Sequence, residues 1–155
     1  MIDKNRACAF SGHRILSGGF SLDELKKAVY KAINDGLDTF LCGMALGFDT
    51  VAFSVLEEVK LEGHPIKIIA CIPCDSQSLY FKKKQKEEYD RMVSAADERI
   101  LVSDKYFDGC MQKRNEFMVE NCTRLITYLN FNRGGTYNTV KYAVSRDVEI
   151  CYLGK

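Results

Sequence analysis

A chain of 155 residues can bury a sizeable hydrophobic core and is short enough for one domain, residues 1–155. Its 46% hydrophobic and 28% charged residues are ordinary for a globular protein. The net charge of +1 argues against a protein that binds nucleic acid mainly through a large excess of positive charge. No apolar run reaches the roughly 20 residues of a membrane span, and no signal-peptide core follows the N-terminus, so a cytoplasmic location is expected. Seven cysteines, an odd number within apolar runs, indicate buried thiols rather than a disulfide framework.

Strand-like and helix-like stretches alternate along the chain. Continuous apolar runs predict buried strands at residues 6–11, 39–42, 66–72, 99–102, 124–129 and 148–153. Amphipathic segments predict helices that end near residues 34, 61, 95, 121 and 145. Ser21 and Glu24 form a capping-box pattern before the first helix, and the last helix is expected from Thr136. This alternation predicts an α/β fold of the Rossmann-like, doubly wound kind, with a mainly parallel sheet and helices on both faces.

Glycine-rich or polar turns follow several predicted strands. They are Gly12-His13-Arg14, residues 43–49, Pro73-Cys74 and Gly134-Gly135-Thr136. Because the carboxyl ends of parallel strands share one edge of a sheet, where doubly wound folds bind ligands, these turns are expected to lie together.

The turn Gly134-Gly135-Thr136 is the first candidate for a phosphate site. Backbone N–H groups at a helix start favour an anion, and the hydroxyl of Thr136 adds a donor, with Thr139 one turn further on. In the alternative interpretation this is a tight turn in which Thr136 caps the helix.

The other turns leave two interpretations open as well. Gly43 and Gly47 either let a ligand approach the backbone or serve packing, and Asp49 either binds a ribose hydroxyl or favours the helix start. His13 and Arg14 either contact a phosphate or base, or lie in solvent.

Arg114 and Asn115 lie near the start of a helix that is predicted over residues 110–121. The planar guanidinium of Arg114 suits phosphate, and the alternative is a surface salt bridge, for example with Glu116. Asn115 is unusual inside a helix, which favours a polar task. The cysteines and histidines lack the spacing of a zinc site, so no metal is expected.

Taken together, these motifs resemble the SLOG superfamily of Rossmann-like domains, and within it the YpsA-like branch. The resemblance covers nearly the whole chain and includes Pro73, Gln77 and Tyr89. It implies a ligand site at the following positions: Gly12, His13, Arg14, Gly43, Met44, Gly47, Asp49, Pro73, Arg114, Asn115, Gly134, Gly135, Thr136 and Thr139.

Two related groups imply different activities. Residues 111–114, MQKR, resemble the helix motif of the Lonely Guy phosphoribohydrolases, which cleave the N-glycosidic bond of nucleoside monophosphates. Their turn, Pro-Gly-Gly-x-Gly-Thr-x-x-Glu, is altered here to NRGGTYNT at residues 132–139, and Thr139 replaces the catalytic glutamate. Residues 42–49, CGMALGFD, resemble a segment of DprA, which binds single-stranded DNA.

The resulting prediction is a nucleotide-binding sensor or regulatory protein. Its ligand would be a nucleoside monophosphate, ADP-ribose or a fragment of NAD, and no other cofactor is expected. One alternative is a phosphoribohydrolase-like enzyme that uses Glu116, Glu120 or Asp49. A second is a single-stranded DNA binder, which the near-zero net charge disfavours. Because relatives often form dimers, a homodimer is a candidate assembly, and no membrane partner is expected.

Overall fold

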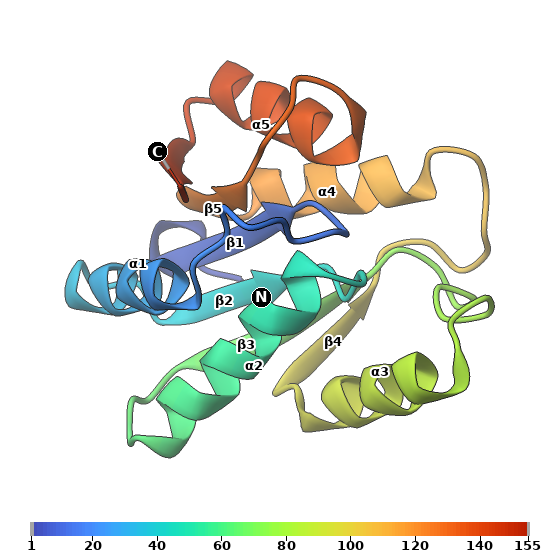
Figure 1. Ribbon diagram of the computed structural model, residues 1–155, viewed down its shortest axis with the longest axis horizontal. Helices are drawn as coiled ribbons and strands as arrows, with labels where there is room; N and C mark the ends of the chain where they lie inside the picture. The colour runs from blue at the N-terminus through green and yellow to red at the C-terminus, as the bar shows by residue number, and fades with distance from the viewer. Residues whose placement is uncertain (1, 155) are drawn as a thin grey trace.

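The computed structural model describes residues 2–154 and confirms the predicted Rossmann-like α/β fold (Figure 1). In this range, six parallel strands form one sheet in the order β4-β3-β2-β1-β5-β6. The strands are β1 (Ala7–Gly12), β2 (Thr39–Cys42), β3 (Lys67–Ile72), β4 (Glu98–Leu101), β5 (Arg124–Tyr128) and β6 (Glu149–Tyr152). The helices are α1 (Leu22–Asn34), α2 (Phe48–Leu61), α3 (Lys83–Ala95), α4 (Cys110–Glu120) and α5 (Gly134–Ser145), after a short 3-10 turn, η1 (Lys4–Arg6).

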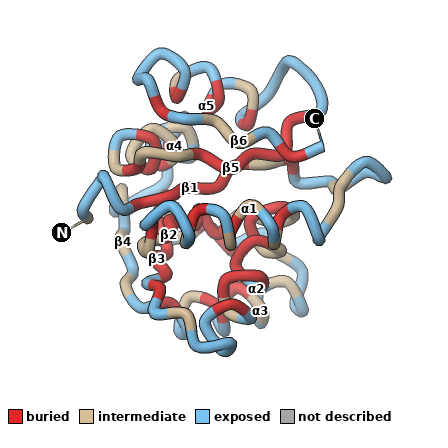
Figure 2. The backbone as a smooth tube through the Cα atoms, turned by 90° about the vertical axis from the view of Figure 1, so that its left-hand side faces the viewer, coloured by how far each residue is buried: buried red, intermediate tan, exposed pale blue. Residues whose placement is uncertain are grey.

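The sheet lies between two layers of helices, with α1, α2 and α3 on one face and α4 and α5 on the other (Figure 1, Figure 2). Each face has its own hydrophobic core. Within β1, Cys8 and Phe10 pack toward the first layer, whereas Ala7 and Ala9 pack toward the second. Because both faces are covered, successive residues are all buried, which explains the continuous apolar runs in the sequence.

The helix ends agree with the sequence predictions in part. The Ser21 hydroxyl accepts the N–H of Glu24 at 3.2 Å, as expected for an N-cap. The prediction that the Glu24 side chain bonds back to Ser21 was wrong, because the Glu24 carboxylate accepts the N–H of Gly154 at 2.8 Å instead. Helix α5 begins at Gly134, two residues before its predicted start, so Thr136 lies inside the first turn and does not cap it.

The strand order reverses between β1 and β5, which pair in register from Cys8 with Arg124 to Gly12 with Tyr128. The turns after β1, β2, β3 and β5 therefore meet at the carboxyl edge, where doubly wound sheets bind ligands. All seven cysteines are free thiols, and six are buried. In the part of the chain that the structure describes, no helix is long and apolar enough to cross a bilayer.

Candidate functional site

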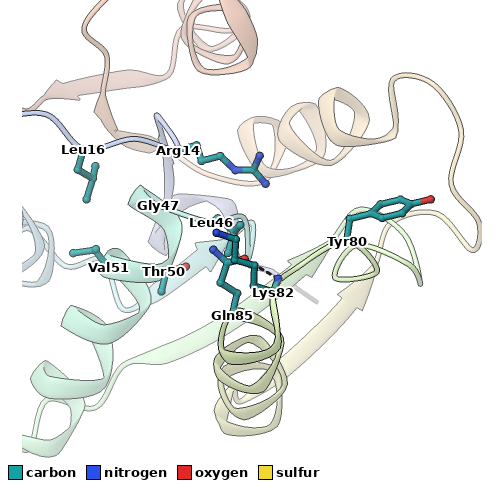
Figure 3. Close-up of a pocket in the computed structure, with 9 residues that line it drawn as sticks. All are labelled: Arg14, Leu16, Leu46, Gly47, Thr50, Val51, Tyr80, Lys82 and Gln85. Carbon is teal, nitrogen blue, oxygen red and sulfur yellow. Dashed lines mark hydrogen bonds between the residues drawn. The ribbon is translucent and has the colours of Figure 1, made fainter.

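An open groove with a volume of about 690 Å³ lies at the carboxyl edge of the sheet (Figure 3). The turn after β1, the start of α2 and the segment before α3 form its walls. Its lining residues are Arg14, Leu16, Leu46, Gly47, Thr50, Val51, Tyr80, Lys82 and Gln85. Arg14 lies on one side of the groove, and Lys82 and Gln85 face it from the other (Figure 3). Three segments that are distant in sequence thus supply one site.

Gly47 fixes the shape of this groove. Its φ of +82° favours glycine, and a Cβ atom at this position would overlap the backbone carbonyl of Arg14. The N–H of Phe48 donates to the carbonyl of His13 at 3.2 Å, which joins the start of α2 to the turn after β1. Gly47 therefore allows the start of α2 to contact the turn after β1, and it also lines the groove.

The groove is cationic. Within residues 2–154, neither Arg14 nor Lys82 has a carboxylate at ion-pair distance. In the same range, the basic residues of α3 that form ion pairs are Lys86 and Arg91. Exposed Lys83 and Lys84 add charge at the start of α3, whose first turn has no acidic residue. Positive charge at the positive end of a helix dipole is unfavourable for the free protein, so an anionic ligand would relieve it.

A buried hydrogen-bond network supports the groove from below. The carbonyl of Gly43, just after β2, accepts the amide Nε2 of Gln77 at 3.0 Å and also the guanidinium of Arg114. The hydroxyl of Tyr89 donates to Gln77 Oε1 at 2.9 Å. Arg114 Nη1 also donates to the carbonyl of Cys71 at 3.3 Å. The network joins the ends of β2 and β3 to α3 and α4.

Arg114 is only 4% exposed, so it is neither a surface salt-bridge residue nor a side chain that projects into solvent. Its Nε donates to the Asn115 Oδ1 at 2.8 Å, which gives Asn115 a local partner. A Cβ atom added to Gly43 would lie 2.8 Å from the Arg114 Cζ and 3.0 Å from Asp49 Oδ2. Gly43 therefore leaves room for these two buried charged side chains.

Asp49 lies in the first turn of α2 and is 7% exposed. Its carboxylate accepts the N–H of Ala45 at 3.1 Å, so it holds the turn that precedes the helix. Burial raises the pKa of Asp49 to about 6, although the charge of Arg114 acts in the opposite direction. Burial also lowers the pKa of Arg114 from its usual value, while Asp49 acts to raise it.

His13 joins the turns after β1 and β5. Its Nε2 accepts the N–H of Asn130 at 2.8 Å, and its ring stacks on Phe131 with the centroids 4.1 Å apart. Burial lowers the pKa of His13 below 6.5, which favours the neutral ring that this acceptor role requires. His13 therefore holds two loops together at the point where the strand order reverses, while its neighbour Arg14 lines the groove.

The glycine turn at the start of α5 is open on its outer side. Added Cβ atoms at Gly134 and Gly135 would meet no atom within 4 Å, and Arg133 at the N-cap provides no side-chain hydrogen bond. Gly134 has a φ of +91°, so the conformation favours glycine. The Thr139 hydroxyl donates to the Gly135 carbonyl at 2.8 Å and is buried inside its own helix. This turn is a second place at the same edge with the geometry of an anion site.

Of the remaining predicted positions, Gly12, Pro73, Glu116 and Glu120 do not line the groove. Pro73 is buried after β3, and a Cβ atom at Gly12 would overlap the ring of Phe48. Glu116 and Glu120 line a different hollow, between β4 and α4. Glu120 also accepts the hydroxyl of Tyr142. The structure therefore does not bring the two candidate catalytic carboxylates to Arg14.

Sequence reasoning missed most of the groove lining. Lys82 belongs to a run of four lysines and one glutamine at residues 82–86, a pattern typical of a solvated helix face, and Tyr80 is 93% exposed in a segment without periodicity. The only available signal was the density of lysines at a helix start. Among residues 2–154, no group of three or more histidine, cysteine, aspartate or glutamate side chains is arranged to hold a metal ion.

The sheet order and the site at its carboxyl edge define a Rossmann-like α/β protein. Within that class, the model of the YspA SLOG family matches residues 22–149, and the chain therefore belongs to this family. The uncharacterized SPbeta prophage-derived protein YoqJ of Bacillus subtilis strain 168 is 33% identical over 116 residues, which are 67% of this chain and 68% of YoqJ. A UPF0398 protein of Listeria welshimeri is 23% identical over 130 residues, 80% of this chain and 71% of that protein.

Solved structures of DNA processing protein A share the fold. The protein from Streptococcus pneumoniae superposes with a TM-score of 0.66 at 19% identity, over 94% of this chain and 49% of that chain. The protein from Helicobacter pylori, which binds single-stranded DNA, superposes with a TM-score of 0.68 at 16% identity, over 97% of this chain and 65% of that chain. This chain thus spans about half of the first protein and about two thirds of the second.

Proposed function

We propose that this protein binds a nucleotide or a nucleotide-derived ligand, such as a nucleoside monophosphate, ADP-ribose or a fragment of NAD, as a sensor or regulatory protein. The observation that carries the proposal is the groove in which Arg14 and Lys82 flank the start of α2 without an anionic partner among residues 2–154. A guanidinium and an ammonium beside a helix start suit a phosphate group.

Binding is favoured over hydrolysis because of where the carboxylates lie. Glu116 and Glu120 line another hollow, and Asp49 is buried against the N–H of Ala45. Incubation with nucleoside monophosphates, followed by chromatography, is expected to release no free base. Base release that persists in Arg14→Ala but disappears in Glu116→Gln would contradict the proposal and support the phosphoribohydrolase alternative.

Calorimetric titration with nucleoside monophosphates, ADP-ribose and NAD tests the binding proposal directly. Arg14→Ala and Lys82→Ala are each expected to weaken binding by about tenfold to a hundredfold, since a hydrogen bond to a charged group contributes about 1.5–3 kcal/mol. Lys141→Ala is the matched control, because this lysine lies over the Tyr137 ring on α5 and does not line the groove. Equal affinity of the wild type and the three variants for every ligand would contradict the assignment of the groove as the binding site.

Single-stranded DNA is the second candidate ligand. Tyr80 is 93% exposed and lines the same groove as Arg14 and Lys82, and a groove with both aromatic and cationic side chains suits successive bases and phosphates. The H. pylori protein with the same fold binds single-stranded DNA, which supports this candidate.

Fluorescence anisotropy with a labelled thymidine oligomer separates the two candidates. If DNA is the ligand, the oligomer binds far more tightly than a mononucleotide, its affinity falls steeply with added salt, and Tyr80→Ala weakens it by about 1–3 kcal/mol. Phe107→Ala is the control, because Phe107 is also an exposed aromatic residue but does not line the groove. Competition by a mononucleotide at similar concentration would instead favour the small ligand.

A further inference from the structure

A second pocket, with a volume of about 230 Å³, adjoins the cationic groove. It lies between α2 and α3 and shares Leu46, Thr50 and Gln85 with the groove. The residues that line only this pocket are Met44, Phe81, Lys84, Glu88, Tyr89 and Met92. Two methionines and two aromatic rings make its wall mainly apolar, in contrast to the groove beside it.

The wall of this apolar pocket is held in place by the network under the groove. The Tyr89 hydroxyl donates to Gln77, and the Phe81 ring packs edge-on against the Tyr89 ring with the centroids 5.6 Å apart. Met44 is 1% exposed and has a φ of +63°, a conformation that is uncommon for a residue other than glycine. Such a conformation persists only where the surrounding structure imposes it, and it is enriched at ligand sites.

We infer that the apolar pocket receives the base of the nucleotide whose phosphate lies in the groove. This inference rests on the proposed function and adds the place in the structure where the base of the ligand binds. One continuous site has cationic side chains at one end and thioether and aromatic side chains at the other. Methionine sulfur and aromatic rings both make favourable contacts with a flat ring system.

Gln85 lies at the junction of the groove and the pocket. Its side-chain oxygen accepts the backbone N–H of Lys82 at 2.9 Å, which fixes the amide (Figure 3). No residue between 2 and 154 accepts from the Gln85 side-chain nitrogen, so this donor is available to a ligand. It is placed to bind an acceptor on the sugar or the base of a nucleotide that spans both parts of the site.

The test compares four nucleoside monophosphates with ribose 5-phosphate and inorganic phosphate by calorimetry. At least one nucleotide is expected to bind about tenfold or more tightly than ribose 5-phosphate, in line with the usual contribution of base stacking. Met92→Phe fills the apolar pocket and should remove this advantage without changing the affinity for ribose 5-phosphate. Val144→Phe, which adds the same ring in a separate hollow on α5, should retain it.

The outcomes separate this inference from the proposed function. If ribose 5-phosphate binds as tightly as every nucleotide, the base pocket is wrong and the phosphate groove stands. If neither binds, the proposed function falls as well. An advantage that survives in folded Met92→Phe would overturn the inference by placing the base elsewhere.

A second measurement does not depend on the folding of a variant. Methyl NMR of the wild-type protein follows all five methionines at once. A bound nucleotide should shift the methyl signals of Met44 and Met92, through the ring current of its base, and ribose 5-phosphate should not. Met118, in the core on the opposite face of the sheet, is the internal control. A nucleotide that binds without shifting Met44 or Met92 would overturn the inference.

Discussion

The side-chain Nε2 of Gln77 donates to the backbone carbonyl of Gly43 at 3.0 Å, across 34 positions of sequence. This bond ties the segment before α3 to the end of β2, and Tyr89 fixes the far side of the same amide. Arg114 binds the same carbonyl from α4. The floor of the groove is therefore a buried polar network, and its members should affect stability more than affinity.

Arg114→Ala is expected to destabilise the fold by about 3–5 kcal/mol, because it removes a buried guanidinium that binds the carbonyls of Gly43 and Cys71 and also removes the positive charge near the Asp49 carboxylate. Urea unfolding measures this loss. Arg14→Ala, at an exposed position, should change stability by less than about 0.5 kcal/mol. A stable Arg114→Ala protein with lost ligand affinity would instead support the phosphate contact predicted from sequence.

Asp49 should make stability depend on pH. Its pKa is about 6 in the folded protein against an ordinary value of 3.8, so the folded state holds this proton more tightly than the unfolded state. The resulting stability is complete below about pH 3.8 and is lost as the pH rises through 6, which amounts to about 3 kcal/mol.

Asp49→Asn removes this titration, so the difference in unfolding free energy between wild type and variant should change by most of that amount between pH 4 and about 7. Carboxylates with lowered pKa values, such as Asp35 and Asp38, give the opposite slope but cancel in the difference. A pH-independent difference would show that Asp49 titrates normally.

Gly47→Ala is expected to cost more than about 2 kcal/mol, because the φ of +82° is strained for alanine and the new Cβ meets the Arg14 carbonyl. Thermal and urea unfolding measure the cost. Gly19→Ala is the matched control, since a Cβ there meets nothing within 4 Å, and it should be nearly neutral. Equal effects of the two substitutions would mean that the turn after β1 moves freely away from α2.

His13 should titrate below pH 6.5, since burial lowers its pKa. The contribution of His13 to the free energy of unfolding is fully present above pH 6.5. It is lost as the pH falls through the pKa of His13 in the folded protein, because the protonated ring no longer accepts the N–H of Asn130. NMR should therefore show the His13 ring and the Asn130 amide shifting with one midpoint. Phe131→Ala exposes the ring and should move that midpoint upward, and an unchanged midpoint would contradict the role of stacking.

The order of elements, the parallel sheet and the family were predictable from the sequence. Continuous apolar runs such as residues 66–72 occur because β3 is covered on both faces, and short links between alternating elements leave few other topologies. The Ser21 cap was predictable for the same local reason, since its hydroxyl bonds a residue three positions away.

The roles of individual residues at the edge of the sheet were decided by tertiary structure. Arg114 and Gly43 both belong to recognisable motifs, yet in the structure the buried Arg114 side chain binds the Gly43 carbonyl. The two residues are 71 positions apart, so no local sequence pattern could predict this contact. Lys82 and Tyr80 carry little local signal, yet the crossover between β3 and β4 brings them opposite Arg14. Local hydrogen bonds and apolar periodicity depend on residues that are close in sequence, so the sequence predicts them. A groove is formed by side chains that only the folded chain brings together.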